Sequence, residues 1–172
     1  MEHIKRFLQD KMTERIAPGK AVLIFGARRV GKTVLMKDIV KSFQGKSLIL
    51  NGEDYDAASL LSNRSISNYK HIFEGVDLLA IDEAQNVPEI GNVLKLIVDE
   101  LPQIRVVASG SSSFDLLNKI GEPLVGRSSQ FLLTPFSQRE ISQIEIGLQS
   151  RQNLESRLIY GSYPEVVMMD NF

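Results

Sequence analysis

Short runs of apolar residues alternate along the chain with longer segments in which apolar residues recur at helical spacing. Each short run predicts a strand, and they lie at 21–25, 47–50, 77–81, 105–108 and, as a shorter fifth strand, 130–133. The third run is apolar at nearly every position, which is typical of a strand covered on both faces. Strands that alternate with helices in this way indicate an α/β fold with a parallel sheet between helical layers.

The segments between the strands predict the helices. Residues 3–12 place four apolar side chains on one helical face, namely Ile4, Phe7, Leu8 and Met12. The helix that follows residue 33 is expected to bury Val34, Leu35, Ile39 and Val40. We also expect one or two helices between the polar stretch 51–56 and Glu74, a helix from Pro88 to Leu101, and a helix at 114–119.

The C-terminal part of the chain has a different organisation. Ser137 and Glu140 have the S-x-x-E spacing of a capping box, which predicts a helix that begins outside the sheet. We therefore divide the chain into a sheet-containing core, residues 1–136, and a partial helical lid, residues 137–172. The apolar stretch 163–169 stops without a polar terminus, so we expect that the lid is truncated and that the natural protein continues.

The composition narrows the class of protein. Of the 172 residues, 43% are hydrophobic and 24% charged, which excludes a collagen-like or disordered chain. No apolar run approaches the ~18 residues of a membrane span, and the start lacks the apolar middle of a secretory signal. Without cysteine there is no disulfide, and the net charge of −1 gives no global attraction to nucleic acid or anionic lipid. We expect a soluble, cytoplasmic protein without a membrane partner.

Eight residues directly after the first strand match the phosphate-binding pattern G-x-x-x-x-G-K-[ST]. They are Gly26, Ala27, Arg28, Arg29, Val30, Gly31, Lys32 and Thr33. In this candidate phosphate loop, main-chain N–H groups and a helix N-terminus surround an anion, and glycine avoids side-chain collisions. Lys32 can reach the β- and γ-phosphates, and the Thr33 hydroxyl can bind Mg²⁺. Together with Val34, the eight residues are our candidate nucleotide-binding residues.

The two arginines of the candidate phosphate loop have a less defined role. Arg28 and Arg29 can contact phosphate, contact a neighbouring subunit, or be solvated loop charges, and the sequence leaves these alternatives open.

Two adjacent carboxylates end the third predicted strand. Asp82 and Glu83 follow an apolar run, 50 residues after Lys32 in the case of Asp82. At the carboxyl edge of a parallel sheet Asp82 would face the same crevice as the candidate phosphate loop, where a carboxylate can hold Mg²⁺ through its water shell. Glu83 can orient, or take a proton from, the water that attacks the γ-phosphate. Acidic residues also end many strands as turn residues, which is the structural alternative.

Together these features resemble the AAA-type ATPases. The resemblance is carried by the candidate phosphate loop, by Asp82-Glu83-Ala84-Gln85 and by Ser109-Gly110-Ser111-Ser112, with weaker matches at 124–127 and 160–165. It is narrower to a bacterial and archaeal group in which an ATPase core precedes a C-terminal domain of unknown function. It implies a five-stranded parallel P-loop NTPase sheet over residues 1–136, in which the strand of Asp82 is not adjacent to the phosphate-loop strand. It also implies ATP and Mg²⁺ as ligands.

The resemblance implies roles for two further residues. Ser109 falls on the family's sensor position, where a hydroxyl contacts the γ-phosphate or the attacking water; a plain Ser/Gly turn is the alternative. Arg127 matches the arginine finger that reaches into a neighbouring subunit's site, which implies a homo-oligomer; a surface salt bridge is the alternative. The lid arginine of many AAA proteins has no evident counterpart, and Gly161-Ser162-Tyr163-Pro164 lies near its place.

Other nucleotide-dependent activities fit the sequence less well. Proteins that resemble GTPases carry an Asn-Lys-x-Asp motif, whereas Asn118-Lys119-Ile120-Gly121 lacks the carboxylate that would pair with guanine. A small-molecule kinase would normally lack the Glu next to Asp82 and carry a basic cluster for its substrate. A slow nucleotide-gated switch that binds ATP to regulate a partner or DNA is not excluded by any residue.

The sequence therefore predicts a Mg²⁺-dependent ATPase, in which Lys32, Glu83 and Arg127 are catalytic and Thr33 and Asp82 hold the metal. The two histidines, His3 and His71, are isolated, so we expect no metal beyond that of the nucleotide. A DNA or protein partner is an open alternative, because five basic residues gather near the start, although such a run is usually a solvated face; they are Lys5, Arg6, Lys11, Arg15 and Lys20.

Overall fold

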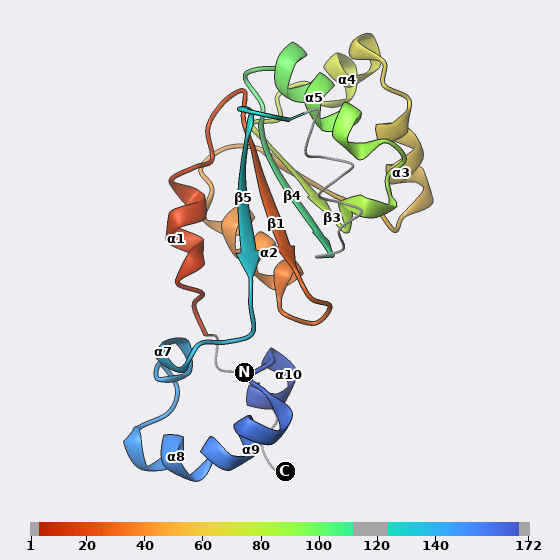
Figure 1. The fold of residues 1–172 in the computed structure, drawn as a ribbon. Helices are drawn as coiled ribbons and strands as arrows, with labels where there is room; N and C mark the ends of the chain where they lie inside the picture. The colour runs from red at the N-terminus through yellow and green to blue at the C-terminus, as the bar shows by residue number, and fades with distance from the viewer. Residues whose placement is uncertain (1–3, 112–123, 169–172) are drawn as a thin grey trace.

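Five parallel strands form the centre of the fold in the computed structural model, which describes residues 4–111 and 124–168 (Figure 1). They are β1 (Ala21–Gly26), β2 (Ser47–Asn51), β3 (Leu78–Asp82), β4 (Arg105–Ser111) and β5 (Ser128–Leu133). Their order across the sheet is β2-β3-β4-β1-β5, and all neighbouring strands are parallel. The predicted α/β fold with a five-stranded parallel sheet is confirmed.

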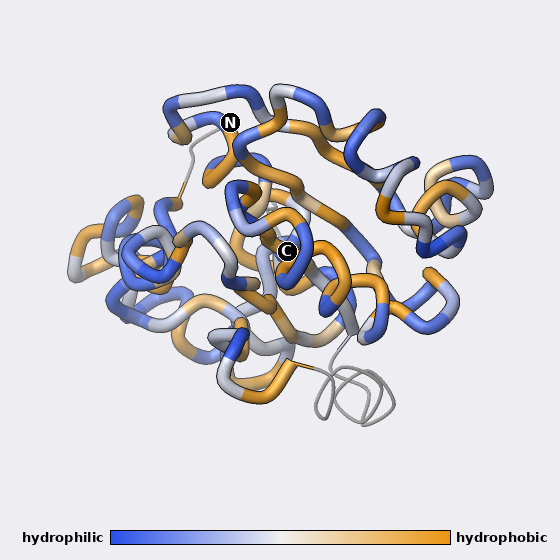
Figure 2. Tube along the Cα trace, turned by 90° about the horizontal axis from the view of Figure 1, so that it is seen from above, coloured by the Kyte–Doolittle hydropathy of each residue, from blue (hydrophilic) through white to orange (hydrophobic). Residues whose placement is uncertain are grey.

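Helices cover both faces of this sheet. Successive side chains of a strand point to opposite faces, so Val22 and Ile24 of β1 pack into one helical layer and Leu23 and Phe25 into the other. The first layer contains α1 (Leu8–Thr13) and α2 (Lys32–Ser42), and the second contains α3 (Tyr55–Ser62), α4 (Ile66–Ile72) and α5 (Ile90–Glu100). Seen from above, the hydrophobic segments gather along the strands between these layers (Figure 2).

The order of the strands determines which residues can meet at the edge of the sheet. β4 lies between β1 and β3, so the strand of Asp82 is not adjacent to the strand that precedes the candidate phosphate loop, as the resemblance implied. The register places Gly26 beside Ser111 and Ile81 beside Ala108. The carboxyl ends of the three strands therefore lie along one edge, the place where open α/β sheets bind their ligands.

The helices after β5 lie beyond this carboxyl edge (Figure 1). Within residues 124–168 they are α7 (Gln138–Ile141), α8 (Gly147–Gln152), α9 (Leu154–Tyr160) and α10 (Pro164–Met168). The predicted capping box opens α7: the Ser137 hydroxyl accepts from the Glu140 N–H at 3.2 Å, and the Glu140 carboxylate accepts from the Ser137 N–H at 2.8 Å. No helix in the described part of the chain is both long and apolar enough to cross a bilayer.

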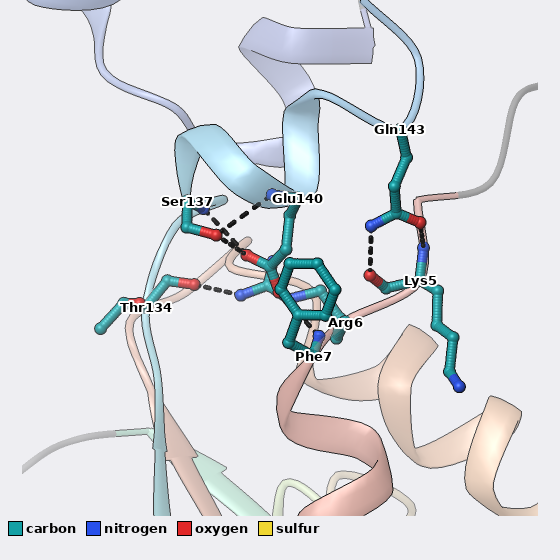
Figure 3. A network of polar contacts seen from close by, with 7 residues as sticks. All are labelled: Lys5, Arg6, Phe7, Thr134, Ser137, Glu140 and Gln143. Carbon is teal, nitrogen blue, oxygen red and sulfur yellow. Dashed lines mark hydrogen bonds and ion pairs between the residues drawn. The ribbon is translucent and has the colours of Figure 1, made fainter.

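A buried ion pair joins the N-terminal segment to α7 (Figure 3). The Arg6 Nε lies 3.2 Å from the Glu140 Oε1, and both side chains are less than a tenth exposed. Arg6 also donates to the Thr134 carbonyl, and its guanidinium lies 4.5 Å from the centroid of the Phe136 ring. Burial lowers the pKa of the Arg6 guanidinium, and the carboxylate of Glu140 opposes that shift.

The opening helix is shorter than predicted, because α1 begins at Leu8 and not at residue 3. Ile4 is buried, but it lies before the helix and packs against Phe136 and Ile141. The main-chain N–H of Phe7 donates to the Glu140 Oε1 at 3.1 Å, a tertiary contact in place of a helical one. The predicted apolar face therefore serves two separate cores, and the Phe7 side chain is exposed.

The prediction that Val34 is buried in the helix is wrong, since its side chain is 54% exposed. Because α2 begins at Lys32, its buried positions follow the helical repeat from that residue and include Met36 in place of Val34.

The prediction that the fifth strand is the shorter one is wrong, because β5 already begins at Ser128 and has six residues, as many as its neighbour β1 and one more than β2 or β3. Ser128 and Ser129 pair with Ala21 and Val22 through main-chain groups, which an apolar pattern cannot reveal. For the same reason β4 continues to Ser111, three residues beyond the predicted end. The helix expected at 114–119 lies outside the described residues.

Candidate functional site

The candidate phosphate loop connects β1 to α2 at the carboxyl edge of the sheet. A Cβ at Gly26 would lie 2.5 Å from the Leu133 carbonyl oxygen and 2.9 Å from a Val30 methyl group, so only glycine fits there. Gly31 has a φ of 100° and is the N-cap of α2. In a helix that begins here, the N–H groups of Lys32, Thr33 and Val34 have no carbonyl partner within the helix. These donors and the helix dipole make the loop suited to an anion.

The side chains of the loop divide into inward and outward groups. The Lys32 ammonium donates to the carbonyl oxygens of Gly26 and Ala27, each at 3.1 Å, and the residue is only 4% exposed. Val30 is fully buried in the core, so it can offer a ligand only its main chain. Arg28, by contrast, is exposed. The charge of Lys32 therefore lies inside the curve of the loop, whereas those of Arg28 and Arg29 lie outside it.

Thr33 and Asp82, 49 positions apart, are in direct contact at this edge. The Thr33 hydroxyl donates to the Asp82 Oδ2 at 2.7 Å. The other carboxylate oxygen, Oδ1, accepts from the Ser109 hydroxyl and from the Glu83 N–H at 3.1 Å. The contact joins the candidate phosphate loop to the acidic pair across the width of β4.

Ser109 lies beneath Asp82 rather than at the mouth of the site. It is 1% exposed, and besides donating to Asp82 its oxygen accepts from the Glu83 N–H at 3.3 Å. In this structure its hydroxyl orients the acidic pair, while a contact with a γ-phosphate stays a prediction.

Glu83 turns the chain sharply after β3. Its φ of 47° and ψ of 44° lie in the left-handed region, where a residue with a side chain is uncommon. The turn is packed against Gly52, whose N–H donates to the Asp82 carbonyl at 2.8 Å. A Cβ on Gly52 would lie 2.5 Å from the Glu83 carbonyl oxygen. Sequence reasoning missed Gly52, although a glycine directly after the second strand was a usable signal.

Another contact that was not predicted links the candidate phosphate loop to the C-terminal helices. Arg29, with a φ of 63°, forms an ion pair with Glu165 of α10, the Nη1 lying 2.8 Å from the Oε2. Pro164, the first residue of α10, would lie 3.7 Å from a Cβ on Gly31. Arg29 therefore has a partner within its own chain, which was not among the three alternatives that the sequence left open.

Arg127 lies at the opposite edge of the sheet. Its carbonyl accepts from the N–H of Ala21 at the start of β1, whereas the candidate phosphate loop begins at the end of that strand, about 17 Å away. Its Nε lies 2.6 Å from the Asp99 Oδ1. Arg127 therefore does not contribute to the loop of its own chain.

The basic residues near the start do not form one charged surface. Lys5 pairs with Asp10, with Nζ 2.7 Å from the Oδ1, and Arg6 is buried against Glu140. Lys11, Arg15 and Lys20 are exposed. The cluster seen in the sequence thus loses two of its five charges to intramolecular ion pairs.

The donor set at Asp82 fits a hard divalent cation. One hydroxyl and one carboxylate, already in contact, leave the rest of an octahedral shell to water and to phosphate oxygens, which is how Mg²⁺ is usually held. Thr33 and Asp82 are the residues that would hold it.

Comparison with known proteins identifies a family for most of the chain. A family described as an AAA domain matches residues 18–142. The uncharacterized protein Rv2008c of Mycobacterium tuberculosis is 30% identical over 122 residues, which cover 70% of this chain and 26% of that protein. The uncharacterized protein MJ1544 of Methanocaldococcus jannaschii is 24% identical over 178 residues, which cover 91% of this chain and 38% of that protein. The chain thus spans well under half the length of these curated relatives.

Solved structures share the fold at lower identity. The Pif1 helicase from Candida albicans superposes with a TM-score of 0.55 and 16% identity, over 96% of this chain and 46% of the helicase. Bacteroides Pif1 bound to ssDNA gives a TM-score of 0.55 and 15% identity, over 96% of this chain and 48% of that chain. These likenesses extend to the fold.

Proposed function

The chain belongs to the AAA domain family, and from that premise we propose that it is a Mg²⁺-dependent ATPase core that binds ATP at residues 26–33 and hydrolyses it to ADP and phosphate. One observation carries the proposal most directly: the Thr33 hydroxyl and the Asp82 carboxylate are 2.7 Å apart. This contact places a glycine-flanked helix N-terminus and a strand-end carboxylate side by side, which is the arrangement that a nucleotide and its metal require.

Binding begins with the triphosphate entering the curve of the loop. The N–H groups at the start of α2 donate to its oxygens, and Lys32 exchanges the carbonyls of Gly26 and Ala27 for phosphate oxygens. The exchange replaces two neutral acceptors with negatively charged oxygens, which attract the ammonium by their charge as well as by the hydrogen bond. Lys32 therefore supplies affinity without leaving the loop.

Thr33 and Asp82 hold the metal in this proposal. When bound, Mg²⁺ neutralises charge on the phosphate oxygens. Ser109 then keeps the Asp82 carboxylate in one orientation from below.

Glu83 acts on the water. Its carboxylate accepts a proton as the water oxygen bonds to the γ-phosphorus, while the bond from that phosphorus to the ADP oxygen breaks and ADP leaves with the electron pair. A positioned base of this kind typically contributes ~10²–10⁴-fold in rate. The left-handed turn at Glu83 fixes where its side chain leaves the backbone.

A slow nucleotide-gated switch is the second candidate function. The ion pair between Arg29 and Glu165 favours it. A phosphate bound to the loop would compete with Glu165 for Arg29, and loss of the ion pair would release α10 from the loop.

Two substitutions test the proposal. We expect Lys32→Ala to abolish ATP binding measured by calorimetry, whereas Lys37→Ala, which removes an exposed lysine five residues further along α2, leaves affinity unchanged. We expect Glu83→Gln to retain ATP but stop phosphate release, with the exposed Glu74→Gln as its control. Unchanged affinity in the lysine variant would refute the assignment of the loop. Slow turnover by the wild type, with ATP-dependent changes around α10, would favour the switch.

A further inference from the structure

Gln85 links the carboxylate of Glu83 to the end of β4. It lies in the short 3₁₀ turn Ala84–Asn86 that follows the left-handed Glu83. Its side-chain Nε2 donates to the Glu83 Oε2 at 2.5 Å, and its Oε1 accepts from the main-chain N–H of Ser111 at 3.3 Å.

The two contacts require an amide and fix its orientation. An amide offers donors at one end and an acceptor at the other, and here the donor end faces a carboxylate while the acceptor end faces an N–H. Glutamate in this place could accept from Ser111 but could not donate to Glu83 when ionised. Asparagine is one methylene shorter and cannot span the same two partners. The pairing is therefore specific to glutamine.

The position of this bridge matters for the site. Ser111 is level with Gly26, the first residue of the candidate phosphate loop, on the strand adjacent to β1. Gln85 thus ties the Glu83 side chain to β4, the strand between the acidic pair and the loop. A glutamate side chain has three rotatable bonds, and Glu83 is only half-buried, so packing alone does not hold its carboxylate.

We propose that Gln85 is a positioning residue for ATP hydrolysis, which holds the Glu83 carboxylate by its Oε2 and leaves the Oε1 for the attacking water. The Oε1 has no hydrogen-bond partner among the described residues. The proposal rests on the proposed ATPase function and adds to it the residue that sets the base in place. Gln85 touches neither the nucleotide nor the metal in this account, so its loss should slow the chemical step and spare binding.

The test compares ATP affinity with turnover in the whole chain. We expect Gln85→Ala and Gln85→Glu each to lower kcat about 10- to 100-fold, the range in which a misplaced catalytic group costs rate, while the ATP dissociation constant stays within about twofold. Gln85→Glu preserves size and the acceptor for Ser111 but replaces the donor with a charge that repels Glu83, whereas Gln85→Ala removes the donor without adding a charge. A merely structural role would lower affinity and rate together, so the comparison of the two quantities identifies the positioning role. Asn86→Ala, an exposed neighbour in the same turn, should match the wild type.

The outcomes separate this inference from the proposed function. Wild-type turnover in Gln85→Glu, or a loss of affinity parallel to the loss of rate, would overturn the positioning role and leave the ATPase proposal standing. A wild-type protein that binds ATP without turning it over would overturn both. Slow turnover with normal affinity in both variants, beside an active Asn86→Ala, supports the role.

Discussion

Arg6 and Glu140 form a buried ion pair in which each charge depends on the other for stabilisation. Each side chain is less than a tenth exposed, and Glu140 also accepts from the main-chain N–H groups of Phe7 and Ser137. Removing one partner of a buried pair is costly, because the other charge stays away from water without compensation. The pair therefore holds the N-terminal segment against α7 only while both members are present.

We expect Glu140→Gln to lower the free energy of unfolding by about 3–5 kcal/mol, measured by urea denaturation. Glu155→Gln, an exposed glutamate on α9, should change it by less than about 0.5 kcal/mol. Adding Arg6→Met to Glu140→Gln should recover part of the loss, since no unpaired charge then remains. Equal stability of Glu140→Gln and the wild type would contradict the account of the pair.

At this scale the sequence motifs predicted which residues meet, but not which residues support them. Lys32, Thr33, Asp82 and Glu83 belong to patterns of fixed spacing, and the structure brings them together. Gly52 and Glu165 have no such pattern, because their roles arise where the turn after β2 meets the turn after β3, and where α10 meets the loop. Contacts of this kind depend on how whole elements pack.

The turns after β2 and β3 form the element that positions the acidic pair. β2 and β3 are neighbours, with Asn51 paired to Asp82, so the residue after each strand lies against the other turn. The close approach of Gly52 to the Glu83 carbonyl leaves no space for a methyl group. The left-handed backbone of Glu83 thus depends on a glycine in a different turn.

We expect Gly52→Ala to destabilise the protein by about 1–3 kcal/mol, the usual cost of overpacking, and to lower ATP turnover because Glu83 is displaced. Gly147→Ala is the matched control, since nothing lies within 4 Å of a Cβ at that position. Thermal unfolding and phosphate release measure the two effects. A Gly52→Ala protein with wild-type stability and turnover would show that the turns tolerate the methyl group.

The apolar pattern predicts a strand to within a few residues where both faces of that strand are buried. β3 is buried along its whole length, and its apolar run identified it almost completely. β5 and the end of β4 contain serines that pair through the main chain, so an apolar pattern stops short of their true ends. The opening helix was extended too far, because Ile4 is buried against a different core from that of α1.

At the scale of the whole molecule, Arg127 lies at the opposite edge of the sheet from the site of its own chain. A role in catalysis would therefore require that it acts on the site of a neighbouring subunit. We expect a mixture of Arg127→Ala and Glu83→Gln chains to recover ATPase activity that neither variant has alone, if the arginine completes a neighbour's site. Asp99→Ala removes the same ion pair but retains Arg127, so a purely structural role would make it as defective as Arg127→Ala. Absence of recovery at every mixing ratio would rule out the contribution in trans.

The strand order could not be read from periodicity, which gives strands but not their neighbours. The resemblance to AAA-type ATPases implied only that the strand of Asp82 is not adjacent to the phosphate-loop strand. This is confirmed, and the structure shows that β4 is the strand between them. The division into residues 1–136 and 137–172 stays a prediction, although the helices after β5 do lie beyond the sheet.

The placement of β4 between the two halves of the site has a mechanical consequence. β1 and β3 are two inter-strand steps apart, about 10 Å, and do not share a hydrogen-bonded ladder. A triphosphate that contacts both would link β1 and β3 across β4 and would oppose their separation. The stability of the three central strands would therefore increase when the nucleotide is bound and decrease when it leaves.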